Sequence, residues 1–388
     1  MTVATLRDPT VLRWSLLAVV CLQLPGLQLV VKHTPEALRP WVGAVELLAL
    51  LVYALGLVAL VRRPNVQRAL EGRGVLAALT AIVIAAIAIG YPWADGLSAH
   101  GGGSDADDAM KQVALSILGG GNGYDASTYL GNPISPGSGW ALLWAPLTVV
   151  GAYPMINVVA LLLCAGALGR EGGRGALAGS LMMMLCMSSP GFWRAIVTGN
   201  DLPAIGACTV AVALWLLRTE RTAVLWTLAI TLGLIATSRV VFAYLPCLVA
   251  FAIYRRSPRR ALLVALVGSA VCAAVHLTQM QLVAGDYPPL HLLDKGTRAA
   301  RTTGPLGLWL PSAGAALLML RRWELSPPAW HLWLGLFVPL LTVALGELAA
   351  MEWAVAMWGG TDYLLVAVPP FAAWLAGELT PPVETHNG

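Results

Sequence analysis

Long apolar runs recur along this chain, and short polar segments separate them. A transmembrane helix needs about 20 mostly apolar residues, and the chain supplies such runs many times over. The pattern therefore predicts an all-α, polytopic transmembrane protein with about twelve spans, forming a single integral-membrane domain over residues 1–388. The predicted spans cover residues 11–31, 41–61, 75–91, 154–169, 176–190, 202–217, 222–237, 240–254, 261–283, 305–320, 328–349 and 361–377.

Composition agrees with this class of protein. Hydrophobic residues make up 58% of the 388 positions and charged residues only 11%, whereas soluble domains carry about 25% charged residues. The mean hydropathy is +0.73. The net charge is +4, but the basic residues lie in small clusters at helix ends rather than along one face, so nucleic acid is not expected as a partner.

The distribution of basic residues predicts the orientation in the membrane. The apolar stretch 137–151 is ambiguous, and we interpret it as a re-entrant or surface-lying helix with Trp140 and Trp144 as interfacial anchors. Most of the 24 Lys and Arg residues then fall on one side, which the positive-inside rule assigns to the cytoplasm. We therefore expect a multi-pass protein of the cell (inner) membrane with both termini in the cytoplasm. The long loop 92–136 is expected on the outer, extracytoplasmic face.

That outer loop carries the most informative polar residues. Asp105, Asp107 and Asp108 fall within four positions. Each carboxylate would cost about 2.5–3.5 kcal/mol at the bilayer centre, so the three should face water between hydrophobic spans. A carboxylate in such a place can accept a proton from a hydroxyl nucleophile. The sequence does not decide which of the three aspartates would be the base, and solvated loop residues are the alternative.

Further charged residues are predicted on the same face. Arg239, Lys295, Arg298 and Arg301 could hold a phosphate by charge-assisted hydrogen bonds. Arg239 could equally be an interfacial arginine whose head group reaches the membrane surface. Asp201 precedes Leu-Pro, where either Asn200 or Asp201 would cap the helix, and the cap is compatible with a role in the site.

The order of these features resembles the GT-C superfamily of integral-membrane glycosyltransferases. In that superfamily an acidic residue or pair opens a large outer loop, a segment similar to the one ending at Tyr124 follows, a membrane-dipping helix comes next, and a second Asp lies in a later outer loop. The resemblance covers roughly residues 100–250, through Asp105-Ala-Asp-Asp108, the helix at 137–151 and Asn200-Asp201. The acidic loop here follows the third predicted span rather than the first, and three acids compete for one role.

The resemblance implies an inverting transfer of a sugar from a polyprenyl-phosphate-linked donor to a hydroxyl of a glycan, lipid or protein acceptor. It implies Asp107 as general base, since Asp107-Asp108 best matches the paired acids, with Asp105 second. Asp108 and Asp201 would bind hydroxyls or a divalent cation, and Tyr124 would contact substrate. No cofactor is certain, and a divalent cation is the one candidate. The cationic residues Arg239, Lys295, Arg298 and Arg301 would stabilise the departing phosphate.

Transport is the competing class of function. A multi-span protein with carboxylates and arginines at its outer face could be a lipid-linked sugar flippase or a proton-coupled transporter. Transporters often contain internal repeats and broken helices at the membrane midplane, and the two halves of this chain show no convincing repeat. Glu46 and His276 are the only polar midplane candidates. A non-catalytic membrane scaffold is a third possibility, in which the aspartates would be dispensable.

Overall fold

The computed structural model describes residues 9–26, 34–100, 104–169, 175–283, 285–322, 326–350 and 361–380, and this part of the chain is helical with no strand. The α-helices are α2 (Pro9–Ala18), α4 (Arg39–Val61), α5 (Pro64–Leu70), α6 (Arg73–Gly96), α7 (Ala106–Leu118), α8 (Ser138–Leu143), α9 (Ala145–Val149), α10 (Ile156–Leu168), α11 (Gly175–Met187), α12 (Pro190–Val197), α13 (Leu202–Arg218), α14 (Thr222–Ala236), α15 (Leu245–Tyr254), α16 (Pro258–Leu263), α17 (Ser269–Leu282), α18 (His291–Arg321), α19 (Pro328–Ala350) and α21 (Val368–Leu379).

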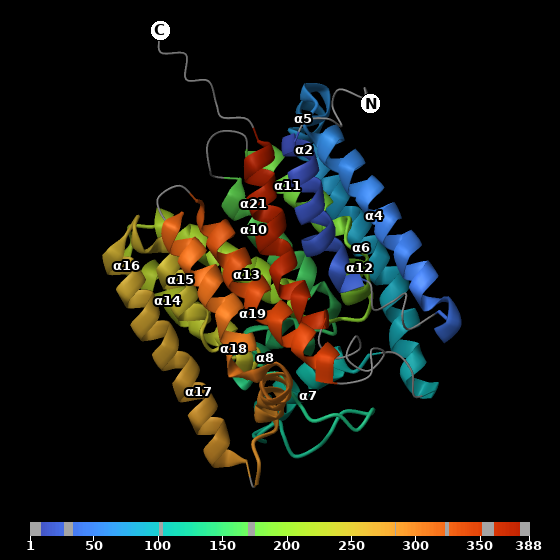
Figure 1. Ribbon diagram of the computed structural model, residues 1–388. Helices are drawn as coiled ribbons and strands as arrows, with labels where there is room; N and C mark the ends of the chain where they lie inside the picture. The colour runs from blue at the N-terminus through green and yellow to red at the C-terminus, as the bar shows by residue number, and fades with distance from the viewer. Residues whose placement is uncertain are drawn as a thin grey trace.

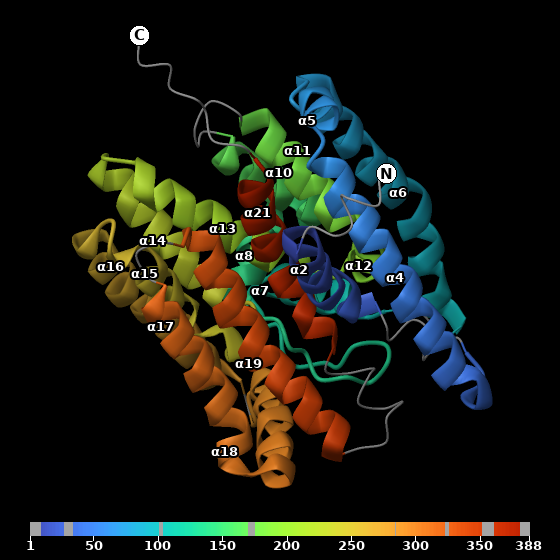
Figure 2. The same cartoon turned by 45° about the horizontal axis from the view of Figure 1, so that its top comes forward.

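The core of the molecule is a group of apolar helices around α13. Nearly every residue of α13 is buried, which fits its apolar sequence, because a helix that is hydrophobic all round is stable only when it is surrounded. Helices α10, α14 and α21 pack against it, and α11 packs on α10 and α21. Helices α4, α5 and α6 form one flank and α14 to α17 the opposite flank in both views (Figures 1 and 2).

Five helices of the described chain are long and apolar enough to cross a membrane, or up to seven if each of two bent pairs counts as one span. Four further apolar helices are shorter, at 10–17 residues. Each of the twelve segments expected from the apolar runs contains helix, but many are interrupted or short, so twelve crossings are not confirmed. The all-helical membrane class therefore stands, and the number of spans is left at five to seven candidates.

One of the bent pairs shows how a break arises. Residues 176–190 were expected to form one span, and α11 covers most of it. Helix α11 ends at Met187 and α12 starts at Pro190, with an angle of 86° between the two helices. Ser189 caps α12 by accepting a hydrogen bond from the Phe192 backbone N–H at 3.4 Å, and proline at the first helical position is compatible with a helix start. The turn sends α12 sideways to contact α6.

The expected outer loop 92–136 is partly helical. Helix α6 continues through Pro92 to Gly96, and the acidic segment opens the amphipathic helix α7. Residues 137–151 form two short helices, α8 and α9, and neither is among the candidate spans. The expectation that Trp140 and Trp144 anchor this segment at the membrane interface is wrong, since both side chains are buried in the protein, Trp140 completely.

Candidate functional site

Asp107 lies on the buried face of α7. The buried residues of this helix include Asp107, Met110, Val113 and Ala114, the spacing of one helical face, so the apolar side chains that hold α7 on the protein also carry the Asp107 carboxylate inward. Only 2% of the residue is exposed. The Tyr91 hydroxyl donates a hydrogen bond to Asp107 Oδ2 at 2.5 Å. Asp107 is thus fixed between α6 and α7, whereas Asp108, next in sequence, is only partly buried.

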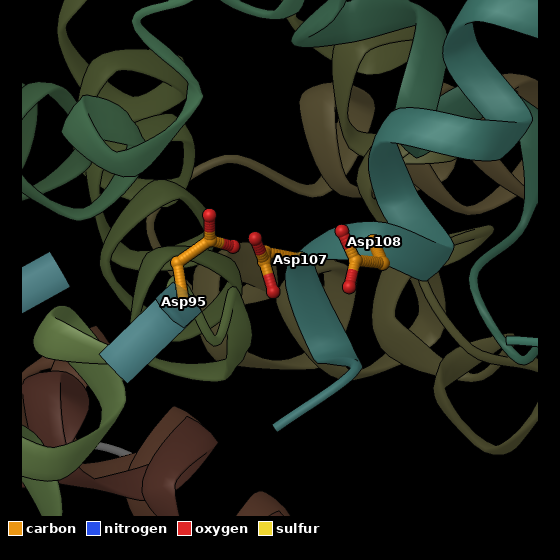
Figure 3. Close-up of side chains that lie close together, drawn as sticks. All are labelled: Asp95, Asp107 and Asp108. Atoms are coloured by element: carbon orange, nitrogen blue, oxygen red, sulfur yellow. The ribbon is translucent and has the colours of Figure 1, made fainter. Parts of the chain in front are cut away.

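Lys111 connects the carboxylates of this site. It lies one helical turn after Asp107 and Asp108, and its Nζ is 2.8 Å from Asp107 Oδ2 and 3.0 Å from Asp108 Oδ1. The same ammonium donates to the Tyr91 hydroxyl at 3.1 Å and lies 3.9 Å from Asp95 Oδ1 at the end of α6. Figure 3 shows the Asp95 and Asp107 carboxylates facing one another, with Asp108 further along α7. These residues form what we call the acid cluster: Asp95, Asp107 and Asp108 around Lys111.

The electrostatics of the acid cluster follow from partial burial. Burial raises the pKa of Asp107, and the hydrogen bonds from Lys111 and Tyr91 only partly oppose this effect. Burial alone would lower the pKa of Lys111, but the hydrogen bond and charge of Asp107 outweigh it, so the pKa of Lys111 is raised. Lys111 therefore carries its positive charge at neutral pH, while Asp107 is a stronger proton acceptor than an ordinary aspartate.

A second polar segment, Gly199-Asn200-Asp201, packs directly on Asp107. Gly199 has a φ of +64°, and a Cβ built on it would lie 2.7 Å from the Asp107 Cβ and 3.1 Å from the Tyr91 ring. A positive φ and so close an approach both favour glycine. Gly90 makes the neighbouring contact, since a Cβ there would lie 2.7 Å from Val197 of α12. Glycines on both segments thus let α6, α7 and the start of α13 meet.

Asp201 and Arg239 form a buried ion pair. Arg239 donates to Asp201 Oδ1 at 2.8 Å and to Oδ2 at 3.2 Å, and Trp140 Nε1 donates to Oδ2 at 2.6 Å. Asp201 is fully buried and Arg239 is 4% exposed, so Arg239 is not an interfacial arginine reaching the membrane surface. Of the two residues expected to cap α13, Asn200 rather than Asp201 does so, since Asn200 Oδ1 accepts a hydrogen bond from the Leu202 backbone N–H at 3.0 Å. The pair joins three segments beside the acid cluster.

Asp105 and Tyr124 hold the irregular segment that follows α7. Asp105 Oδ2 accepts hydrogen bonds from Thr128 and from Asn132, the latter at 2.8 Å. Tyr124 is buried, donates to the Pro136 carbonyl at 3.0 Å, and packs edge-on against Tyr287 with ring centroids 5.2 Å apart. The geometry gives both residues a clear role in positioning this segment.

The predicted phosphate-binding residues of α18 are separate from the acid cluster in their recorded contacts. Arg298 donates to Glu347 of α19 at 3.2 Å, and Arg301 is exposed. The Lys295 side chain lies outside the described residues. Neither Arg298 nor Arg301 makes a recorded polar contact with the acid cluster or with the Asp201–Arg239 pair.

Three residues of the site were not anticipated from the sequence. Lys111 is i+4 from Asp107, a spacing that predicts an ion pair on a helix, so this signal was present. Tyr91 and Asp95 lie at and beyond the end of an apolar run, and nothing in their local pattern points to α7. Their role follows only from the contact of α6 with α12 and the segment around Gly199.

Comparison with protein families, curated proteins and solved structures found no match for this chain. The chemistry of the site therefore has to be argued from its geometry. The site offers a buried carboxylate with a raised pKa, a fixed positive charge beside it, and three carboxylates whose oxygens lie within 4.8 Å of one another. Such an arrangement can accept a proton, and its oxygens are the ligand type that Mg²⁺ and Ca²⁺ prefer.

Proposed function

We propose that this protein is a membrane glycosyltransferase that moves a sugar from a polyprenyl-phosphate-linked donor to an acceptor hydroxyl, with inversion and with Asp107 as general base. The observation that supports it best is the state of the Asp107 carboxylate. Its recorded bonds, from Tyr91 and Lys111, both use Oδ2. Within the described chain Oδ1 therefore has no partner and is available to take a proton from a hydroxyl, as a general base must.

In the proposed reaction the acceptor hydroxyl gives its proton to Asp107 Oδ1 as its oxygen forms a bond to the anomeric carbon. The bond from that carbon to the phosphate oxygen breaks, and the lipid phosphate leaves with the electron pair. Attack opposite the leaving group inverts the anomeric centre. Arg239 pairs with Asp201 and Arg298 pairs with Glu347, so Lys295 and Arg301 are the remaining candidates for the charge on the departing phosphate.

The topology belongs to the same proposal. About twelve crossings, with α8 and α9 as a segment that dips into or lies on the membrane, would place both termini in the cytoplasm and the acid cluster on the extracytoplasmic face of the cell (inner) membrane. The grouping of basic residues supports this orientation. A donor with a polyprenyl tail could then reach the site from the outer leaflet.

Transport has weaker support. Glu46 and His276, the two midplane candidates, lie on α4 and α17, which form opposite flanks of the molecule (Figures 1 and 2). His276 Nδ1 is already hydrogen-bonded to the Tyr287 hydroxyl at 3.0 Å. The two residues therefore do not form a shared proton pathway.

The test is transfer of labelled sugar from polyprenyl-phosphate donors by the purified protein and by Asp107→Asn. The matched control is Asp125→Asn, an exposed loop aspartate that accepts from Asn122 at 2.7 Å and lies outside the acid cluster. We expect transfer by the wild type and the control and loss of at least about 100-fold in Asp107→Asn, the scale of general-base catalysis. Equal transfer by a folded Asp107→Asn variant would contradict the proposal. Donor that crosses proteoliposome membranes without being consumed would indicate a flippase.

A further inference from the structure

The acid cluster has the oxygen ligands of a divalent-cation site, but Lys111 lies among them. Each of Asp95, Asp107 and Asp108 offers one oxygen, and all three lie within 4.8 Å of one another. Lys111 Nζ is 2.8, 3.0 and 3.9 Å from oxygens of Asp107, Asp108 and Asp95. A metal bound to these oxygens at about 2.0–2.6 Å would lie next to the ammonium. Two positive charges that close repel strongly, so the cluster as built does not fit a metal.

We propose that Lys111 is the resident cation of the acid cluster and that the cluster works without a divalent metal. Lys111 is attached to the same helix as Asp107 and Asp108, at the i+4 and i+3 spacings that let an ammonium reach both carboxylates. The positive charge of Lys111 is therefore always present beside the two carboxylates, whereas a metal ion would first have to displace the ammonium group. That the cluster excludes a metal is independent of the proposed glycosyl transfer. Only the statement that catalysis is metal-free rests on the proposed function.

Lys111 also has the contacts of a positioning residue. It binds Asp107 through Oδ2, the oxygen that Tyr91 also binds, and it donates to the Tyr91 hydroxyl as well. These three groups fix the carboxylate in one orientation. The other oxygen, Oδ1, has no hydrogen-bond partner within the described chain, so it is the oxygen left for a proton. A metal bridging both oxygens would remove that availability.

The experiment is Mn²⁺ binding to the purified full-length protein, measured by the loss of the free-ion paramagnetic resonance signal. Wild type is expected to show no detectable Mn²⁺ binding at the acid cluster. Lys111→Met is expected to bind Mn²⁺ with a Kd at least about 100-fold below the highest free Mn²⁺ concentration at which wild type shows none, because the competing charge is gone. Lys111→Arg keeps a positive charge and should behave as wild type. Adding Asp108→Asn to Lys111→Met removes one ligand and should abolish the gained binding.

Two results would overturn the proposal. One is wild-type Mn²⁺ binding that Asp108→Asn abolishes, since Lys111 would then have given way to the metal. The other is a folded Lys111→Met protein that gains no affinity, with Lys111→Gln as the second variant if the first does not fold. Because no sugar donor is present, neither result depends on the proposed glycosyl transfer. In the transfer assay, wild-type activity should persist in a chelator.

A different part of the molecule carries a second, independent inference. A groove of about 580 Å³ lies between α2, the end of α18, α19 and α21, and its walls are apolar, including Leu12, Leu16, Trp333 and Trp374. Arg13 and Arg322 also line it. Arg13 lies near the start of the candidate span Pro9–Gly26, with its guanidinium carbon 5.1 Å from the centroid of the Trp14 ring. Within the described chain neither arginine has an acidic partner.

We infer that this groove binds an anionic phospholipid, with its phosphate on Arg13 and Arg322 and an acyl chain along the apolar wall. The two arginines give the lining of the groove the positive charge that complements a lipid phosphate. The positive-inside rule assigns both to the cytoplasmic side, where juxtamembrane cations attract anionic lipid. A zwitterionic lipid would satisfy the apolar wall but would add a positive group beside the arginines.

Native mass spectrometry of the protein released from nanodiscs tests this site. Nanodiscs of equal phosphatidylglycerol and phosphatidylcholine should yield protein that retains phosphatidylglycerol. The double variant Arg13→Gln/Arg322→Gln should lower that retention at least about tenfold, while Arg321→Gln, a neighbouring arginine that does not line the groove, should not. Equal retention by the double variant, or equal retention of the two lipids by the wild type, would overturn the inference.

Discussion

Removing the guanidinium of Arg239 tests whether the Asp201–Arg239 pair is structural. In Arg239→Met the Asp201 carboxylate would stay fully buried with Trp140 Nε1 as its remaining recorded side-chain donor. The substitution removes the two hydrogen bonds that Arg239 donates to Asp201, and the negative charge of Asp201 is left without its counter-charge. The expected result is a large loss of stability rather than a selective loss of substrate affinity.

The magnitude follows from the burial of both partners. Breaking a buried ion pair by removing one member costs about 3–5 kcal/mol, because a buried charge is left uncompensated. Replacing both members costs much less. We therefore expect the double variant Asp201→Asn/Arg239→Met to be more stable than either single variant. An exposed pair behaves differently, so Arg39→Met, which removes the 3.9 Å contact with exposed Glu36, should cost at most about 1 kcal/mol.

The assay is the free energy of unfolding in detergent of wild type, Arg239→Met, Asp201→Asn, the double variant and Arg39→Met, from denaturant titrations followed by circular dichroism. The ordering that supports a buried pair is wild type above the double variant, and the double variant above both single variants. Equal stability of Arg239→Met and wild type would refute the reasoning, as would simple additivity of the two single losses. Either result would return Arg239 to the list of residues free to bind substrate.

Three further predictions concern the neighbouring residues. Gly199→Ala would place a side chain at a positive φ and bring its Cβ to 2.7 Å from the Asp107 Cβ. It should cost at least about 1–2 kcal/mol in unfolding free energy and lower sugar transfer. Gly166→Ala, where the added Cβ meets open space, is the control. Tyr124→Phe should cost about 0.5–1.5 kcal/mol through the lost bond to Pro136 and leave transfer intact; lost transfer with unchanged stability would contradict this. Because burial raises the pKa of Asp107 above its unfolded value, the native chain binds this proton more readily, so the contribution of Asp107 to stability falls as pH rises through the raised pKa. The unfolding free energy of Asp107→Asn relative to wild type should therefore increase over that pH range in paired titrations, and a flat difference would show that the pKa is not raised.

The apolar pattern predicted the helices well, whereas the twelve membrane crossings are not confirmed. Each expected span contains helix, since apolar runs of this length have few other ways to satisfy their backbone. The pattern does not show where a helix breaks. The 86° turn between α11 and α12 lies at the end of the expected span 176–190. It depends on the Ser189 cap and on the packing of α12 against α6, and the second of these is a long-range contact without a local signal in the sequence.

The candidate site was predictable in part for a similar reason. The acidic helix start and the i+4 spacing of Asp107 and Lys111 are local, so the sequence contains them. Tyr91, which binds Asp107, and Trp140, which binds Asp201, come from segments whose composition suggests only a transmembrane helix or a helix at the membrane interface. Arg239 was expected to face phosphate, but its charge is taken by an aspartate 38 residues earlier. Long-range pairing of this kind leaves no periodic signal in a single sequence.

The Asp201 pocket also constrains how the chain is made. Its partners are Trp140, which precedes it, and Arg239, which follows it. During synthesis Asp201 therefore leaves the ribosome before Arg239, whose positive charge neutralises it in the folded protein. Until Arg239 follows, the Asp201 carboxylate lacks its counter-charge, so we expect the nascent chain to keep it in contact with water. A polypeptide truncated between residues 201 and 239 would lack Arg239, so we expect it to leave Asp201 without a counter-charge and to be unable to bury this residue at the head of α13 as the full chain does.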